Sequence, residues 1–232
     1  DMSTSLNMGK FFPSKWKVTL PMFYNFGQTI VTPLFNPLDP DIRMNDFIGN
    51  NNIDDALKDK VLRQTLDLTE RKGFNLTNVR IDGLKRKKAK PMPWDISNFS
   101  ATYAYSEINR RNINIEFSAN KSYKGNLLYT YNIRNPLTLK PFTKIKALDN
   151  KWFTLIKEFN LQLLPNSFGA SIDFNRTFND LKNRDITSIY ANSNVFENPI
   201  LINKNFTLSR SYNLRWDFCK AIKLRSEERR VG

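Results

Sequence analysis

The stretch FTLSRSYNLRWDF, residues 206–218, decides the fold class of this chain. Every second residue is aliphatic or aromatic, except that Arg210 occupies one of these positions, and polar residues fill the positions between them. Successive side chains of an extended strand point to opposite faces, so a period of two indicates a strand with one apolar and one polar face. The stretch therefore predicts a long β-strand.

The same alternation occurs in five further stretches of the chain. They are residues 16–26, 99–107, 112–120, 123–133 and 167–178. Very short connections near residues 109–110 and 121–122 predict that the three middle stretches form an antiparallel meander with tight turns. Pro21 weakens the first strand or marks a bulge in it. The predicted fold class is all-β, with short helices in the loops.

The segments between these strands predict loops and short helices. Residues 33–40, PLFNPLDP, contain too much proline for regular structure. Residues 53–62 have the apolar spacing of a helix, and Asp54 and Asp55 suit its N-terminus. Residues 84–93 predict a basic loop. Residues 135–166 predict a long excursion with short helices near 142–148 and 151–158.

The length of the strands bears on their environment. The alternating runs have about 9 to 13 residues, whereas strands usually have about 5 to 6. A tilted strand that crosses a membrane needs about 9–11 residues, and aromatic side chains gather near its ends. Soluble β-sandwiches alternate in the same way. The pattern therefore favours a membrane barrel only slightly and leaves a soluble β protein open.

Composition removes several kinds of chemistry. The chain has no histidine, which excludes Ser-His-Asp and Cys-His catalysis and zinc sites that need histidine. Its single cysteine, Cys219, cannot form an internal disulfide or a thiolate cluster. Asp39 and Asp41 are interpreted as turn residues between prolines. We therefore expect no enzyme activity, no cofactor and no metal.

The net charge of +14 permits binding to nucleic acid, to anionic lipid or to acidic protein. The most basic run is residues 85–90, and no RNA- or DNA-binding motif surrounds it. We interpret this run as a solvated loop and expect no nucleic-acid partner.

Both ends of the chain predict that it is an interior piece of a longer protein. The opening DMSTSLNMGKFF has no basic start followed by an apolar core, so no signal peptide is visible. The last eight residues, RSEERRVG, coincide with one reading frame of a common sequencing adapter. We expect residues 1–224 to form one unit, a partial barrel segment. Residues 225–232 are expected to be a non-native tail that packs against nothing.

Several motifs resemble, in order along the chain, those of the SprA/Sov family. Residues 92–107, MPWDISNFSATYAYSE, are similar to its PWDIxNFxxxYxYSE pattern, and residues 120–132, NKSYKGNLLYTYN, to KxYxGxLxYxY. Leu20–Pro21 and TPLFNPLDPDI, residues 32–42, resemble an upstream element, and residues 74–80 and 157–176 also correspond. Residues 25–28 depart from the small-residue pattern expected there. The resemblance covers roughly residues 11 to 218.

The matched motifs identify a set of family-signature structural residues. They are Leu20, Pro21, Pro37, Asp39, Pro40, Asp41, Pro93, Trp94, Asp95, Asn98, Phe99, Tyr103, Tyr105, Ser106, Glu107, Tyr123, Gly125, Tyr129 and Tyr131.

The resemblance implies a function in protein export. This family supplies the outer-membrane translocon of the type IX secretion system of Bacteroidetes, which also supports gliding motility. Its members form one very large transmembrane barrel of about 36 strands, of which this chain is a sector. The implied partners are exported cargo proteins, other secretion-system subunits and outer-membrane lipid, and the implied location is the cell outer membrane. The alternative is a soluble or surface-exposed β-rich binding module, such as an adhesin or a sugar-binding sandwich.

Overall fold

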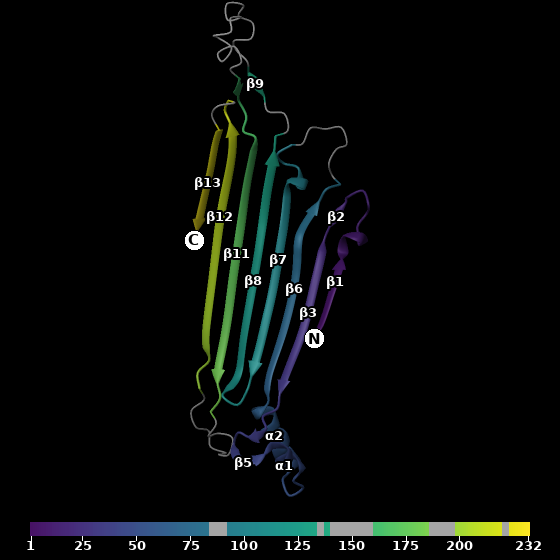
Figure 1. Ribbon diagram of the computed structural model, residues 1–232, viewed down its shortest axis with the longest axis vertical. Coiled ribbons are helices and arrows are strands. Elements are labelled where there is room, and N and C mark those ends of the chain that lie inside the picture. The colour runs from purple at the N-terminus through teal and green to yellow at the C-terminus, as the bar shows by residue number, and fades with distance from the viewer. Residues whose placement is uncertain (84–91, 134–136, 140–159, 186–197, 220–222) are drawn as a thin grey trace, which may run out of the picture.

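The computed structural model describes residues 1–83, 92–133, 137–139, 160–185, 198–219 and 223–232. One antiparallel sheet dominates it, with the strand order β1-β3-β6-β7-β8-β11-β12-β13 and with β2 paired to β6. Figure 1 shows the long strands side by side in a single layer, with the two termini at opposite edges. The predicted all-β class and antiparallel meander are confirmed.

The strands of this sheet have the following bounds. They are β1 (Met2–Asn7), β2 (Val18–Thr19), β3 (Pro21–Val31), β6 (Asp67–Ile81), β7 (Phe99–Arg111), β8 (Ile115–Asn132), β11 (Ser167–Asn183), β12 (Leu201–Asp217) and β13 (Lys223–Val231). The smaller elements are η1 (Met8–Phe11), β4 (Phe35–Asn36), β5 (Asp39–Arg43), α1 (Met44–Gly49), α2 (Asp55–Thr65), η2 (Ile96–Asn98), β9 (Thr138–Leu139) and β10 (Leu161–Gln162).

The predicted tight turn near residues 121–122 is wrong, because β8 runs through it as one strand of 18 residues. Lys121 occupies an apolar position, but Phe117 before it and Tyr123 after it lie on the same face, so the alternation keeps its phase. The turn between β7 and β8 lies at residues 112–114, slightly later than expected. There the side-chain oxygen of Asn112 accepts from the backbone N–H of Ile115 at 2.8 Å.

The 15-residue strand β6 was not predicted, and a β-bulge explains why. Leu76 pairs with Tyr103, but the next paired residue, Val79, lies opposite Ala101, so β6 carries one extra residue. Asn78 takes a positive φ of 51° there, and its N–H donates to Thr102 Oγ1 at 3.1 Å. The bulge moves the apolar side chains from even to odd positions, which hides the period of two.

The N-terminal strand and the proline-rich segment also differ from expectation. Pro21 begins β3 instead of weakening its middle, which fits a residue without an N–H to donate. Residues 35–43 form the two-stranded β4–β5 ribbon, so the expectation of irregular structure for residues 33–40 is wrong in part. The Asn36 side chain accepts from the Leu38 N–H at 3.1 Å and closes the turn. The predicted helix is α2, which Asp54 caps.

Three expectations lie outside the described residues. They are the basic loop for most of its length and the two short helices near 142–148 and 151–158. No helix among the described residues is long and apolar enough to cross a membrane.

The C-terminal residues pair with β12, so the expectation that residues 225–232 pack against nothing is wrong for their backbone. Their side chains are nevertheless exposed throughout β13. Arg225 and Arg230 lie directly opposite Arg215 and Arg210, and like charges in this position destabilise a strand pair. The edge strand β13 therefore lacks the side-chain match that the other long strands have.

The described residues bury very few side chains. Met44 and Val61 are their only buried hydrophobic residues, and both belong to the helices at one end of the sheet. The other two sheets have two strands each, which is too few to cover the long strands. The large sheet therefore keeps both faces open within the part of the chain that the structure describes.

Candidate functional site

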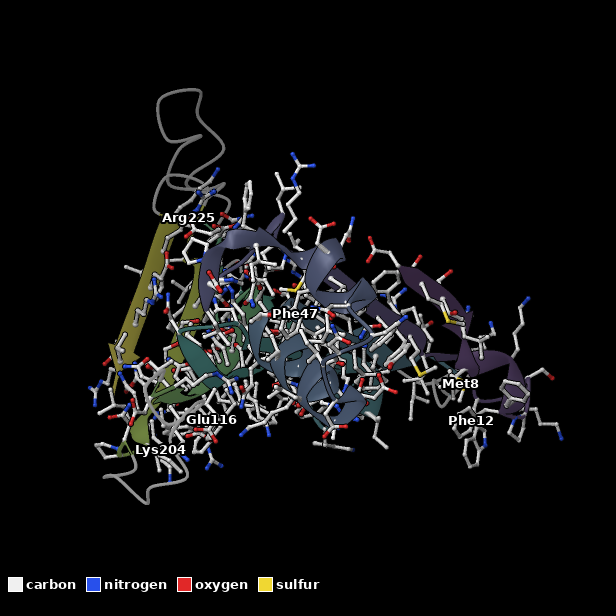
Figure 2. All side chains as sticks on the ribbon, turned by 90° about the horizontal axis from the view of Figure 1, so that it is seen from below. Met8, Phe12, Phe47, Glu116, Lys204 and Arg225 are labelled. Atoms are coloured by element: carbon white, nitrogen blue, oxygen red, sulfur yellow. The ribbon has the colours of Figure 1, made fainter. Side chains whose placement is uncertain are left out.

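The candidate functional site is the large sheet itself, whose two faces differ in chemistry. Residues directly opposite each other in neighbouring strands share a face, and we call each such line of residues a row. The apolar face carries Met22, Tyr24, Phe26, Phe74, Leu76, Val79, Phe99, Ala101, Tyr103, Tyr105, Tyr123, Leu127, Tyr129, Tyr131, Phe168, Ala170, Ile172, Phe174, Tyr212, Leu214 and Trp216. Figure 2 looks along the strands and labels Lys204 on β12, a residue of this face, and Arg225 on β13, a residue of the opposite face, both at one edge of the sheet.

Aromatic rings on the apolar face contact one another across strands. The ring centroids of Phe99 and Tyr129 are 4.9 Å apart, and Tyr129 lies 5.9 Å from Phe168. Further along the same strands, Tyr105 and Tyr123 are 5.0 Å apart. Tilted pairs at these distances stabilise neighbouring strands beyond their burial. The apolar face thus has aromatic side chains near both of its boundaries.

Gly125 leaves room for an aromatic ring on this face. A Cβ atom at Gly125 would collide with Cε1 and Cζ of Phe174, so the ring covers the glycine directly. An aromatic ring that covers a glycine of the neighbouring strand shields its backbone. This close approach explains why a glycine is needed at one position of an otherwise aromatic and aliphatic face.

We expect Gly125→Ala to destabilise the complete parent protein by about 1–3 kcal/mol, because the new methyl group displaces the Phe174 ring. The measurement is the temperature at which the detergent-solubilised protein loses its compact gel mobility. Ser122→Ala, on the other face of β8, is the matched control. An equal loss from both variants contradicts a special function for Gly125.

The apolar face ends along one side at a series of polar residues, which we call the lower boundary. Its members are Gln28 on β3, Lys72 on β6, Glu107 on β7, Lys121 on β8, Arg176 on β11 and Arg210 on β12. Each is the first polar side chain after the apolar run of its strand.

The lower boundary crosses the strands obliquely. The row that contains Gln28 can be followed across five strand-to-strand steps, and on β12 it reaches Ile202. The boundary residue of β12 is Arg210, which lies eight residues further along the strand than Ile202. At about 3.4 Å per residue and about 4.8 Å per strand, the boundary is inclined to the rows by about 50°. The apolar region is therefore an inclined band and not a block that follows the rows.

The other edge of the band has the same inclination. The outermost aromatic residues within the strands are Phe99 on β7, Tyr131 on β8, Phe168 on β11 and Trp216 on β12. The row of Phe99 leads in three steps to Tyr212, four residues before Trp216. With the same spacings, this edge is inclined by about 45°. Two edges made of different residue types thus run nearly parallel.

The opposite face is polar, and most of its side chains are small and uncharged. It carries Ser100, Thr102, Ser106, Ser118, Ser122, Asn126, Thr130, Ser167, Ser171, Asn175, Thr177, Thr207, Ser209, Ser211 and Asn213. Ser171 and Ser211 share a hydrogen bond of 2.7 Å across strands. Shallow hollows lie on this face, one of them lined by Thr102, Asp173 and Thr207. Apart from apolar residues such as Ala104, Ile108 and Leu128, the side chains of this face can hydrogen-bond to water.

The PWDISN signature forms the turn that leads into β7. The Met92 N–H donates to the Asp95 carboxylate at 2.8 Å, and the Asn98 amide donates to the Met92 carbonyl at 2.8 Å. The Tyr129 hydroxyl of β8 donates to the Pro93 carbonyl at 2.7 Å. The structure therefore brings together signature residues from two of the matched motifs.

The other signature residues lie in three places. Phe99, Tyr103, Tyr105, Tyr123, Gly125, Tyr129 and Tyr131 lie on the apolar face of β7 and β8, with Glu107 at the lower boundary and Ser106 on the polar face. Leu20 and Pro21 lie at the start of β3. Pro37, Asp39, Pro40 and Asp41 lie in the β4–β5 ribbon at the far end of the sheet, near α1 and α2 (Figure 1).

Sequence reasoning missed the contribution of β6 to the site and the inclination of its boundaries. The boundary residues could be recognised singly, as with Arg210, but their alignment depends on the register between strands. Within the described part of the chain, no group of three or more cysteine or carboxylate side chains is placed to hold a metal ion.

Comparison with known protein families adds one match. Residues 1–48 match the family model SprA_N, described as a motility related/secretion protein. The match covers β1, β3 and the β4–β5 ribbon, and it ends within α1. Comparison with curated proteins gives no match. This match over residues 1–48 supports membership of the SprA family of motility-related and secretion proteins through the N-terminal region alone.

Proposed function

We propose that this chain is a sector of the outer-membrane barrel through which the type IX secretion system exports folded proteins, and which also supports gliding motility. In this proposal the apolar face contacts lipid and the polar face lines the water-filled lumen. In the part of the chain that the structure describes, the sheet has free edges at β1 and β13, where the rest of the barrel would continue it.

The inclined apolar band is the observation that carries this proposal. Strands of outer-membrane barrels are tilted by about 35–45°, so an apolar band level with the membrane must cross the rows at a similar angle. Along β8 the band extends from Tyr123 to Tyr131, about 27 Å of strand and about 20 Å of height at this tilt. The apolar band of such barrels is about 25 Å tall. A soluble sandwich has no reason to incline both edges of its apolar face equally.

The composition of the polar face supports its assignment to the lumen. Hydroxyl and amide side chains on an exposed face need no fixed protein partners, because water satisfies them. Few charges interrupt this face on the central strands, where Lys124 of β8 and Asp173 of β11 are the main ones. A surface of this kind gives a passing folded protein few strong ionic contacts.

Adjacent residues of β11 offer a direct test in cells that export an epitope-tagged cargo protein. A benzophenone amino acid replaces Ser171, on the polar face, or Ile172, on the apolar face, of the complete parent protein. We expect Ser171 to give adducts with the tagged cargo and Ile172 to give adducts with lipid. Thr102 and Ala101 form a matched pair on β7.

Cargo adducts from Ile172 and Ala101 at the level given by Ser171 and Thr102 would contradict the assignment of the faces. Protein adducts from both faces to other segments of the parent, without lipid adducts, would favour a packed sandwich.

A further inference from the structure

We propose that Lys72, Lys121, Arg176 and Arg210 form a line of phosphate-binding cations for anionic lipid headgroups. This inference rests on the proposed function, because it requires the apolar face to contact lipid. It assigns a ligand class and four binding residues to the lower boundary of that face.

The four cations belong to four different strands, and a strand tilt of about 45° brings them within about 8 Å of one height. Lys72 and Lys121 share one row. Arg176 lies two residues away from that row along β11, and Arg210 lies four residues beyond the row of Arg176 along β12. With the band level in a membrane, the total displacement of about 20 Å along the strands from Lys72 to Arg210 offsets the tilt over the four strand-to-strand steps between them. The line then follows the lower edge of the band, where hydrocarbon gives way to headgroups.

The spacing of the line suits separate lipids. Neighbouring cations are about 8–14 Å apart by strand spacing and rise per residue. Each can therefore contact a different headgroup. One guanidinium group can bind two phosphate oxygens at the same time, whereas the lysine ammonium group binds phosphate as a point charge. The long stems of both residue types lie along apolar surface while their charged ends reach polar groups.

The one acid in the boundary is already engaged by protein groups. The Glu107 carboxylate accepts from the Tyr105 hydroxyl at 2.7 Å and from the Asn109 amide at 3.0 Å, and Lys121 Nζ lies 3.9 Å from it. Within the described residues, no ion pair joins Arg176 or Arg210 to a carboxylate. Both arginines are exposed, so their charges can bind an external anion.

If the rows themselves lay level with the membrane, Arg210 would have a different position. It would lie between Tyr212 and Leu208 in the interior of the band, where a charge is strongly disfavoured. The inclined arrangement instead leaves Leu208 and Phe206 beyond Arg210, in the headgroup layer. Aromatic side chains are common there.

A local fluorescence measurement tests the line in the complete parent protein, reconstituted in phosphatidylcholine bilayers. In a cysteine-free background, Ala119→Cys carries a fluorophore on the apolar face, two residues from Lys121. Spin-labelled phosphatidylglycerol or spin-labelled phosphatidylcholine then quenches it. We expect the anionic lipid to quench more strongly, with apparent affinity falling about fivefold for each nearby cation removed and falling also with salt.

The test variant changes all four cations to glutamine: Lys72→Gln, Lys121→Gln, Arg176→Gln and Arg210→Gln. The matched control removes four cations from the polar face of the same sheet: Arg71→Gln, Arg80→Gln, Lys124→Gln and Arg215→Gln. We expect the preference for the anionic lipid to disappear in the test variant and to remain in the control.

The outcomes separate this inference from the proposed function. Equal quenching by the two lipids in the unchanged protein, or a preference that survives in the test variant, overturns the phosphate-binding line alone. Absence of quenching by either lipid overturns the line and also the assignment of this face to lipid.

Discussion

Leu214→Arg is expected to lower the level of the complete parent protein in the outer membrane, whereas Asn213→Arg leaves it unchanged. Leu214 lies four residues from Arg210 on the apolar face of β12. At the observed inclination of the band, this distance along the strand places Leu214 about 10 Å above the lower boundary. That places it near the middle of the band. An arginine at the midplane of a membrane barrel costs about 2–4 kcal/mol, whereas a lumen position costs little.

The two variants are matched, because they are adjacent residues of one strand and gain the same side chain. The measurement is the amount of folded protein in outer-membrane fractions, with unchanged protein as the reference. Equal loss from both variants would mean that both faces are buried. That result favours a packed soluble sandwich and removes the pore assignment for β12.

Expressed by itself, the 232-residue chain is expected to aggregate in buffer and to remain dispersed only in detergent. Among the described residues nothing covers its apolar face, with Leu127 43% and Ile172 38% exposed, and the two edge strands have free backbone groups. A sheet without a core cannot offset the chain entropy lost on folding. Sedimentation velocity with and without detergent measures this dependence.

Matched triple variants identify which surface causes the aggregation. Replacement of Leu127, Ile172 and Leu214 by asparagine is expected to slow it, whereas replacement of Asn126, Ser171 and Asn213 by alanine is not. A monodisperse soluble monomer that melts cooperatively would contradict the view that the chain is a sector of a larger wall.

The strands that follow a strict period of two were predictable from sequence, and the others were not. β12 and β11 alternate without a change of phase, so their faces could be assigned before the structure was known. Within β6, the bulge at Asn78 reverses the phase, and Glu70, Arg71 and Lys72 interrupt the pattern. The alternation is therefore too short on either side of the bulge to indicate a strand.

The error near Lys121 has the opposite cause. A charged residue at an apolar position looked like the end of a strand, although the residues on both sides keep the same phase. A pattern of hydrophobicity cannot distinguish a turn from a membrane boundary, because both place a polar residue after an apolar run. Only the register with β7 and β11 shows that Lys121 lies at the boundary of the band while the strand continues.

The inclination of the band also sets the size of the wall that such strands would build. A strand tilted by about 45° occupies about 7 Å of perimeter, since its neighbour lies about 4.8 Å away at right angles to it. A closed wall of about 36 strands then has a perimeter near 250 Å and a diameter of about 80 Å. A folded domain of about 100 residues has a radius of gyration of only about 13 Å. Such an opening admits a folded domain in any orientation.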